Sequence, residues 1–359
     1  MVAVKFGWMV LAGMLMSCSE PCRDAPDGDL GAPTPWEREF VAGAGLPESP
    51  APEFLVAEDG LPLAYRDWTP ADWDGTGSMV LLLHGSSAYG ELYAALGEGM
   101  AAHGVLVRIV DLRGHGLSSC VTPSECGTRS PRIYEDDGAY WPGRPGDALD
   151  DSQHARDVAL HLEHMRTQWP TARLLLMGHS SGGGLVSRVV ESGGTAGLDG
   201  VLLLAPFNHA DQPQNELLSW DCGRGVGTAY AQVDLGALGD AMRSNPHRYV
   251  LDLVKNEEYR AELDTRRYTA TTMLGLSVVD ADRFHAAFRG PTLWVAGEED
   301  ALLDVDGSRG EFERMPGGSA FVTVSETSHV GVTWSSGVAQ VCAEFAKDPG
   351  TVSSGTIAP

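Results

Sequence analysis

Basic residues are scarce in this 359-residue sequence, which contains 25 Lys and Arg against 49 Asp and Glu and has a formal net charge of −24. No cluster of basic residues interrupts the acidic background. Nucleic acids and anionic lipids attract proteins through such clusters, so the composition argues against both as electrostatic partners. The excess of acidic side chains predicts a soluble, well-hydrated surface.

The N-terminus lacks a run long enough to cross a membrane as a helix, because its apolar stretch covers only residues 6–16. This stretch follows Lys5 and suits the hydrophobic region of a secretory signal. It ends in LMSC (15–18), which resembles the lipobox of bacterial lipoproteins; the resemblance implies that Cys18 becomes the lipidated first residue. We therefore expect residues 1–17 to be a signal peptide and the exported protein to meet the membrane through its lipid anchor alone. A soluble secreted or periplasmic protein is the alternative.

Cysteine is sparse, and no cysteine shows the spacing of metal ligands, so no metal site is expected. The six cysteines are Cys18, Cys22, Cys120, Cys126, Cys222 and Cys342. An exported location permits disulfides, and the short spacing of Cys120 and Cys126 predicts a local one. If Cys18 is lipidated, an odd number remains and Cys22 is the candidate for the unpaired residue. Cys222 and Cys342 could equally be small buried hydrophobic residues.

From residue 54 onward, apolar runs of strand length alternate with amphipathic segments of helix length. A hairpin with its turn at Asp59-Gly60 comes first. The predicted strands then cover 79–85, 105–114, 172–178, 201–207, 291–297 and 319–326, and the predicted helices cover 91–104, 152–169, 185–192 and about 331–347. This alternation predicts an α/β fold with a mostly parallel central sheet flanked by helices on both faces.

Several segments fall outside the alternation and define the expected domain organisation. Residues 18–53 are rich in Pro, Gly, Ala and acidic residues and predict a flexible tether. Residues 117–150 predict a long loop, and residues 208–289 predict a partly helical insertion; segments this long are usually functional. The core is therefore expected over 54–207 and 290–347, with an inserted cap or lid over 208–289 and a tail over 348–359.

The sequence GHSSG (178–182) fits the pattern G-x-S-x-G between a predicted strand and a predicted helix. Such a turn exposes its central serine above the sheet and leaves no space for side chains at Gly178 and Gly182. By position Ser180 is the nucleophile, and Ser181 contributes a backbone N–H, so that its side chain should tolerate replacement better. Alone, the pentapeptide also fits a glycine-rich turn with helix-capping serines.

A nucleophilic serine needs a histidine base that a carboxylate orients, and both should follow later strands. His329 follows the run over 319–326 and is the only histidine near the C-terminus. Asp300 follows the run over 291–297 and is our first choice for the acid, with Asp304 as its competitor and Glu299 third. All three acids also fit an acidic surface loop, but the order serine, acid, histidine favours the functional interpretation.

Together, these motifs resemble the α/β-hydrolase superfamily, in particular its monoacylglycerol lipase/lysophospholipase-like (serine aminopeptidase S33-type) branch. The motifs are HGS (84–86), DLRGHGLS (111–118), GHSSG (178–182), GEED (297–300) and SH (328–329). The resemblance implies an oxyanion hole made by the backbone N–H groups of Ser86 and Ser181. It also implies framework roles for His84, His115 and His179, and a substrate-enclosing cap over 208–289. Leu251 and Leu253 could line an acyl channel there or form the cap's own core.

These residues predict a serine hydrolase that cleaves carboxylic esters through an acyl-enzyme, with no metal or organic cofactor. Monoacyl lipids are the substrates that the resemblance implies, while small esters fit the catalytic residues equally. An aminopeptidase or thioesterase of the same fold is the first alternative, and a non-catalytic binding protein of this fold is the second. The sequence leaves acyl length and oligomeric state open.

Overall fold

The computed structural model describes residues 32–43, 45–120, 122, 125–129, 134, 139–193, 197–208, 220–221, 225–227, 230–255, 259–276, 281–315 and 320–359. The expected signal peptide over 1–17, the expected lipidation site Cys18, and Cys22 and Cys222 lie outside the described residues. Within the described ranges, no helix combines the length and apolar character needed to cross a bilayer.

The core is a nine-stranded sheet in the order β1-β2-β4-β3-β5-β6-β12-β13-β14. Neighbours run parallel from β4 to β14, while β2 pairs antiparallel with β1 and β4. The strands are β1 (Glu53–Val56), β2 (Pro62–Trp68), β3 (Ser78–Leu83), β4 (Val105–Val110), β5 (Arg173–His179), β6 (Gly200–Leu204), β12 (Thr292–Gly297), β13 (Ala320–Val324) and β14 (Gly355–Ile357). The predicted mostly parallel sheet is confirmed.

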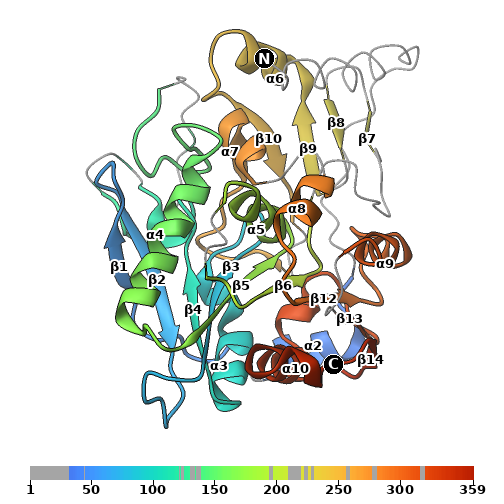
Figure 1. Cartoon of the computed structure of the whole chain (residues 1–359). Helices are drawn as coiled ribbons and strands as arrows, with labels where there is room; N and C mark the ends of the chain where they lie inside the picture. Colours follow the sequence, from blue (N-terminus) through green and yellow to red (C-terminus); the bar gives the residue numbers. More distant parts are fainter. Residues whose placement is uncertain are drawn as a thin grey trace.

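Helices cover both faces of this sheet (Figure 1). On one face lie α4 (Gln153–Gln168), α5 (Ser181–Glu191) and α8 (Ala281–Ala287), and on the other lie α3 (Ala94–Ala102) and α10 (Ser336–Lys347). Successive residues of β3 point to opposite faces, so Met79 and Leu81 join one buried cluster while Val80 and Leu82 join the other. Because both faces are covered, the central strands are apolar throughout.

Between β6 and β12, the insertion predicted over 208–289 contains a second sheet as well as helices. This antiparallel sheet has five strands in the order β11-β10-β9-β8-β7. They are β7 (Trp220–Asp221), β8 (Gly225–Gly227), β9 (Ala231–Asp234), β10 (Tyr249–Leu253) and β11 (Arg267–Thr269), and the accompanying helices are α6 (Leu235–Arg243) and α7 (Ala270–Gly275). Strands of two to five residues are too short to produce a clear alternating pattern, which is why sequence analysis missed them.

The predicted flexible tether over 18–53 is wrong for residues 35–42, which form α2 (Pro35–Ala42). A capping box between Thr34 and Glu37, with Pro35 in the first turn, begins this helix. Figure 1 draws α2 close to β13 and far from β1, the next element of the chain. The capping signal is present in the sequence, but the composition of the surrounding segment obscured it.

The predicted tail over 348–359 is wrong for residues 355–357, which form the edge strand β14. Its register with β13 pairs Gly355 with Val322 and Ile357 with Val324. The N–H of Ser325 also donates to the carbonyl oxygen of Ile357 over 3.0 Å. A strand of three residues gains its stability from the neighbouring strand, so its own residues carry little signal.

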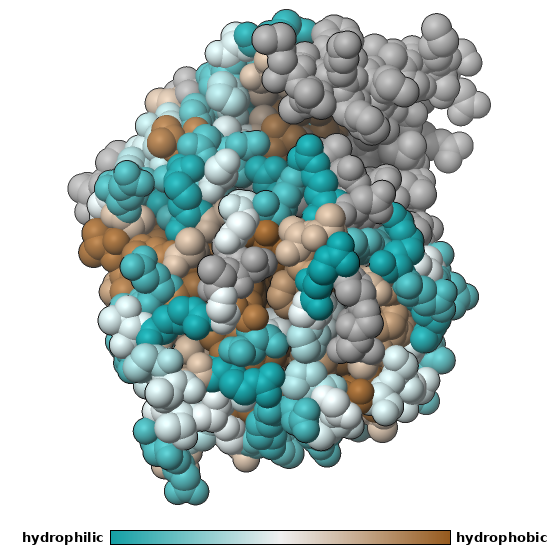
Figure 2. Space-filling view, viewed as in Figure 1, coloured by the Kyte–Doolittle hydropathy of each residue, from teal (hydrophilic) through white to brown (hydrophobic). Residues whose placement is uncertain are grey.

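On the face drawn in Figure 2, hydrophilic residues predominate and hydrophobic residues occur in scattered patches. This surface agrees with the acidic composition, in which Asp and Glu outnumber Lys and Arg by 49 to 25. Scattered apolar residues are ordinary on soluble proteins and mark no interface by themselves.

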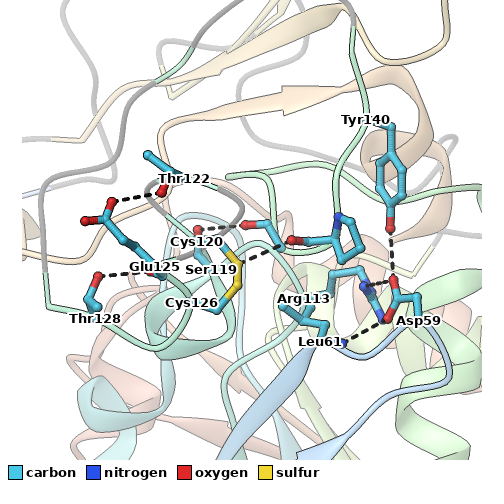
Figure 3. The surroundings of a disulfide bond; sticks show 12 residues. Asp59, Leu61, Arg113, Ser119, Cys120, Thr122, Glu125, Cys126, Thr128 and Tyr140 are labelled. Atoms are coloured by element: carbon cyan, nitrogen blue, oxygen red, sulfur yellow. Dashed lines mark hydrogen bonds and ion pairs between the residues drawn. A yellow bond between two sulfur atoms is a disulfide. The ribbon is translucent and has the colours of Figure 1, made fainter.

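The loop predicted over 117–150 contains a disulfide between Cys120 and Cys126 (Figure 3). The N–H of Cys120 donates to the carbonyl oxygen of Gly143 over 2.7 Å, which holds the two sides of the loop together. Cys342 is a buried free thiol in α10, as one interpretation of the sequence expected.

Arg113 connects this loop to the rest of the core. Its buried guanidinium makes ion pairs at 2.7 Å with both Asp59 and Asp157. The hydroxyl of Tyr140, in the loop, donates to Asp59 over 3.2 Å, as Figure 3 shows. The loop is therefore anchored to the turn that follows β1 (Glu53–Val56).

Candidate active site

Ser180 occupies a sharp turn between β5 and α5, at a backbone conformation of φ 52° and ψ −126°. A serine at positive φ is strained by roughly 1–3 kcal/mol, and such strain concentrates at functional sites. A Cβ atom on Gly178 would overlap the carbonyl of Gly182, and one on Gly182 would overlap the carbonyl of Leu83. Both glycines are therefore steric requirements of the turn that presents Ser180.

His329 and Asp300 lie together at the ends of neighbouring strands. Nδ1 of His329 is 2.8 Å from Oδ2 of Asp300, and both side chains are buried. The other oxygen of Asp300 accepts hydrogen bonds from the N–H groups of Leu302 (2.8 Å) and Leu303 (2.9 Å). This carboxylate is therefore fixed in orientation, and it favours the imidazole tautomer with its proton on Nδ1.

The second nitrogen of His329 is left available as a base. Nε2 is buried and has no hydrogen-bond partner among the described residues. His329 and Ser180 line the same cavity. The structure therefore brings the predicted nucleophile and base to one site, with Asp300 behind the base.

The competing acids have other surroundings. Asp304 is the N-cap of α9 (Val305–Phe312), where its carboxylate accepts from the N–H of Asp306 over 3.1 Å. Glu299 is exposed. Among the three predicted candidates, only Asp300 has a hydrogen bond to the imidazole of His329 in the described part of the chain, so the geometry separates residues that the sequence left as alternatives.

The two residues predicted to form the oxyanion hole are in direct contact. The hydroxyl of Ser86 donates to the hydroxyl of Ser181 over 2.8 Å. Ser181 is the first residue of α5, where backbone N–H groups lack partners within the helix and favour negative charge. A Cβ on Gly85 would come within 2.9 Å of the Cβ of Ser180, so the loop before Ser86 passes against Ser180.

Three side chains of the inserted segment hold the loop that contains Ser86 and Ser87. The hydroxyl of Tyr230 donates to the carbonyl of Ser86, and the ammonium of Lys255 donates to the carbonyl of Ser87, each over 2.9 Å. The hydroxyl of Tyr268 accepts from the N–H of Ser87 over 2.9 Å. Sequence analysis missed all three contacts, because isolated polar residues in an insertion carry no recognisable pattern.

Lys255 is also paired with a buried acid. Its ammonium lies 2.8 Å from Oδ1 of Asp264. Burial lowers the pKa of Lys255, and the charge of Asp264 opposes that shift. This pair places the cationic donor next to the carbonyl of Ser87 and couples the insertion to the loop at the active site.

His179 lines the cavity and connects the two sides of the site through hydrogen bonds. The N–H of Gly85 donates to the hydroxyl of Tyr93, which contacts Nδ1 of His179; both distances are 2.8 Å. Nε2 of His179 is 2.9 Å from the carbonyl oxygen of His329, to which it donates. Burial lowers the pKa of His179 to about 3, so the ring is neutral in the folded protein.

His84 and His115 also occupy framework positions. His84 accepts from the N–H of Leu112 over 3.0 Å, and burial lowers the pKa of His84 to about 3. His115 contacts the carbonyl of Arg113 at 2.9 Å and the hydroxyl of Tyr268 at 2.7 Å. Their geometry agrees with the framework roles that the family resemblance implied.

The cavity at Ser180 has a volume of about 320 Å³, near the lower end of typical ligand sites. Its lining is mostly apolar and comprises Phe40, Val41, Gly45, Leu46, Gly85, Ser86, Ala88, Leu92, Tyr93, His179, Ser180, Tyr230, Lys255, Tyr259, Arg260, Ala261, His329, Val330, Thr333 and Trp334. Leu251 and Leu253 lie instead in a buried hydrophobic cluster. In the described part of the chain, no group of three or more His, Cys, Asp or Glu residues has a metal-binding arrangement.

Comparisons with known proteins find related sequences. Residues 76–329 match the family described as serine aminopeptidase, S33. A monoglyceride lipase homolog of Monkeypox virus is 23% identical over 247 residues, which cover 67% of this chain and 76% of the viral protein.

Solved structures share the fold at low identity. A soluble variant of monoglyceride lipase from Saccharomyces cerevisiae, in complex with a substrate analog, has a TM-score of 0.60 and 14% identity, covering 89% of this chain and 99% of that chain. A monoacylglycerol lipase of Paleococcus ferrophilus has a TM-score of 0.52 and 16% identity, covering 80% and 99%.

Proposed function

Because this chain belongs to the serine aminopeptidase S33 family of α/β-hydrolases, we propose that it is a serine hydrolase that cleaves carboxylic esters through an acyl-enzyme. The observation that carries the proposal is the hydrogen bond between Nδ1 of His329 and Asp300. The other imidazole nitrogen, Nε2, has no partner among the described residues, and His329 lines the cavity that also contains Ser180. A catalytic serine requires such a base.

In the proposed mechanism, Ser180 attacks the ester carbonyl while Nε2 of His329 takes its proton. The N–H groups of Ser86 and Ser181 stabilise the oxyanion that forms, and Asp300 stabilises the imidazolium. His329 then gives the proton to the departing alcohol, which leaves an acyl group on Ser180. Water attacks this acyl-enzyme with His329 again acting as the base, so the acid is released and Ser180 is restored.

We propose that the substrate is an ester with an apolar acyl chain, such as a monoacyl lipid. The mostly apolar lining of the cavity supports this, as does the similarity of the chain to a monoglyceride lipase homolog and to a monoglyceride lipase. An aminopeptidase would need an acidic group to hold the substrate amine, but the described lining contains Lys255 and Arg260 and neither Asp nor Glu. A thioesterase remains the second candidate, because the same apolar lining accepts a thioester's acyl chain.

We also propose that the protein is exported and lipidated on Cys18, with residues 1–17 removed. The support is the apolar run over 6–16 and the sequence LMSC (15–18). Incorporation of labelled palmitate in wild type, and its loss in Cys18→Ser, would support this proposal. Absence of incorporation in the wild-type protein would reject it.

The nucleophile can be tested directly with a fluorophosphonate probe. The probe should label the wild-type protein and fail to label Ser180→Ala. Ser187→Ala is a matched control, because Ser187 is a buried serine in the same helix and does not line the cavity. Labelling that persists in Ser180→Ala would reject Ser180 as the nucleophile.

A further inference from the structure

The N-terminal helix α2 is attached to the loop that contains His329. The carboxylate of Glu37 is fully buried, and one of its oxygens accepts from the N–H of Ser328 over 2.8 Å. Its other oxygen accepts from the N–H of Thr34, also over 2.8 Å. A Cβ on Gly331 would overlap the Glu37 carboxylate, so the loop after His329 is shaped to receive it.

Two aromatic side chains extend this attachment along the helix. The indole N–H of Trp36 donates to the carbonyl of Glu326 over 2.8 Å. The ring of Phe40 stacks on Trp334, with centroids 5.5 Å apart and an angle of 19° between the planes. Trp334 also lies beside Tyr259 of the insertion, at 6.1 Å between centroids. Helix α2 therefore packs against the element that follows His329.

Beyond these contacts, α2 and the residues after it form part of the cavity lining. Phe40, Val41, Gly45 and Leu46 all line the cavity that contains Ser180. Val41 is 49% exposed and Leu46 is 38% exposed, so both apolar residues are accessible to solvent. Apolar side chains that line a catalytic cavity and stay accessible to solvent can gain stability by contacting an apolar ligand.

We propose that Phe40, Val41 and Leu46 form a wall of the acyl-binding site, so that this N-terminal segment determines the preference for acyl-chain length. The inference rests on the proposed ester hydrolysis, because only a substrate held at Ser180 would bring its acyl chain to this wall. Short acyl groups end near Ser180 and do not reach the wall. Longer acyl chains contact the wall and displace the water there.

The test compares p-nitrophenyl esters from acetate to palmitate as substrates of Phe40→Ala and Leu46→Ala. We expect kcat/KM for the long-chain esters to fall on the order of tenfold, the size expected for lost apolar contacts in a pocket. Hydrolysis of the acetate should be unchanged in Leu46→Ala. Phe40 also stacks on Trp334 after His329, so for Phe40→Ala the measured quantity is the ratio of kcat/KM for the long-chain esters to kcat/KM for the acetate, which should fall by the same factor. Glu39→Ala is the matched control, because Glu39 is exposed on the same helix and does not line the cavity. If Phe40→Ala fails to fold, Leu46→Ala still tests the proposal, because it removes only a partly exposed side chain.

Several outcomes would contradict the proposal that these residues form a wall of the acyl-binding site. Wild-type chain-length preference in both variants would do so, as would an equal loss for acetate and long-chain esters. A second series, of acetate esters with lengthening alcohols, should be insensitive to the substitutions; a loss confined to that series would place the wall on the alcohol side. If the wild-type protein hydrolyses no ester in either series, the proposed function fails, which is a different result from ester hydrolysis with an unchanged preference.

Discussion

The hydroxyl of Ser86 donates a hydrogen bond to the hydroxyl of Ser181 over 2.8 Å. These are the two residues whose backbone N–H groups we propose as the oxyanion hole, so the bond fixes one donor relative to the other. Sequence analysis had expected the side chain of Ser181 to be replaceable, because only its backbone was assigned a role. The structure gives the side chain a contact that this interpretation lacked.

We expect Ser181→Ala to lower kcat/KM about five- to tenfold, because one neutral hydrogen bond contributes about 1 kcal/mol. Ser180→Ala should remove measurable turnover. Kinetics with a p-nitrophenyl ester would provide both values. Ser192→Ala serves as the control at the other end of α5, where its hydroxyl bonds only the carbonyl of Val189 in the described structure. Equal activity of Ser181→Ala and wild type would show that the hydroxyl pair is dispensable.

Asp300→Asn and Asp304→Asn should behave differently. The first should reduce kcat by roughly 10³–10⁴, because an asparagine amide favours the wrong tautomer of His329. The second should retain kcat and lose at most about 0.5 kcal/mol of stability, because asparagine caps a helix about as well as aspartate and only the charge near the N-terminus of α9 is lost. Steady-state kinetics and thermal unfolding of the pair would separate the two effects. A large loss of kcat in Asp304→Asn but not in Asp300→Asn would show that Asp304, and not Asp300, is the acid that orients His329.

Tyr230→Phe removes one hydroxyl from the contacts that hold the loop at Ser86. We expect kcat to fall about fivefold, because the lost hydrogen bond contributes about 1 kcal/mol and the carbonyl of Ser86 is freed to move. Tyr140→Phe is the control, since its hydroxyl bonds Asp59 and Gln153 away from the cavity. If both variants match the wild type, the insertion does not position the oxyanion loop.

Glu37→Gln keeps the size of the side chain but gives it one acceptor oxygen in place of two. Either Ser328 or Thr34 then loses the partner of its N–H group, at a cost of about 1–3 kcal/mol. We expect lower thermal stability together with a lower kcat for a short-chain ester at unchanged KM, because the loop with His329 loses its support. Glu39→Gln on the exposed side of α2 should alter neither quantity.

Stability should fall as the medium becomes acidic, and His161 accounts for part of this dependence. Burial lowers the pKa of His161 to about 3, from an ordinary value of 6.5. Neutral His161 makes its full contribution to stability above pH 6.5. As the pH falls from 6.5 toward 3, the free energy of unfolding decreases by about 1.4 kcal/mol per pH unit, because only the unfolded chain takes up the proton.

Between pH 7 and pH 5, we therefore expect the free energy of unfolding to fall by about 2 kcal/mol less in His161→Phe than in the wild type. Urea unfolding at the two pH values measures the difference, and any constant effect of the substitution cancels. His103→Gln, at an exposed position, is the control. An identical loss in wild type and His161→Phe would contradict the assignment.

The central sheet could be predicted because each of its inner strands is a buried apolar run, such as β3 and β5, separated by an amphipathic helix. Periodicity reports this kind of burial directly. Helix α2 could not be predicted in the same way, because its eight residues are fixed by contacts with Ser328 and Trp334, almost three hundred positions away in the sequence. The short strands of the insertion depend on one another in the same manner.

The candidate site was predictable to the extent that it follows strand ends. Ser180, Asp300 and His329 occupy such positions, and their order along the chain made them candidates. The sequence did not separate Asp300 from Asp304, because both lie in one acidic loop and only the fold decides which faces His329. Tyr230 and Lys255 could not be found, because their role depends on how the insertion folds over Ser86 and Ser87.

The contact between Glu37 and Gly331 has an evolutionary consequence. Since any side chain at position 331 would collide with the Glu37 carboxylate, position 331 cannot change while Glu37 is kept. A relative that has no counterpart of α2 is released from this constraint and can accept a larger residue after its histidine. Covariation between the two positions would therefore identify, among divergent sequences, the descendants that inherited this N-terminal helix.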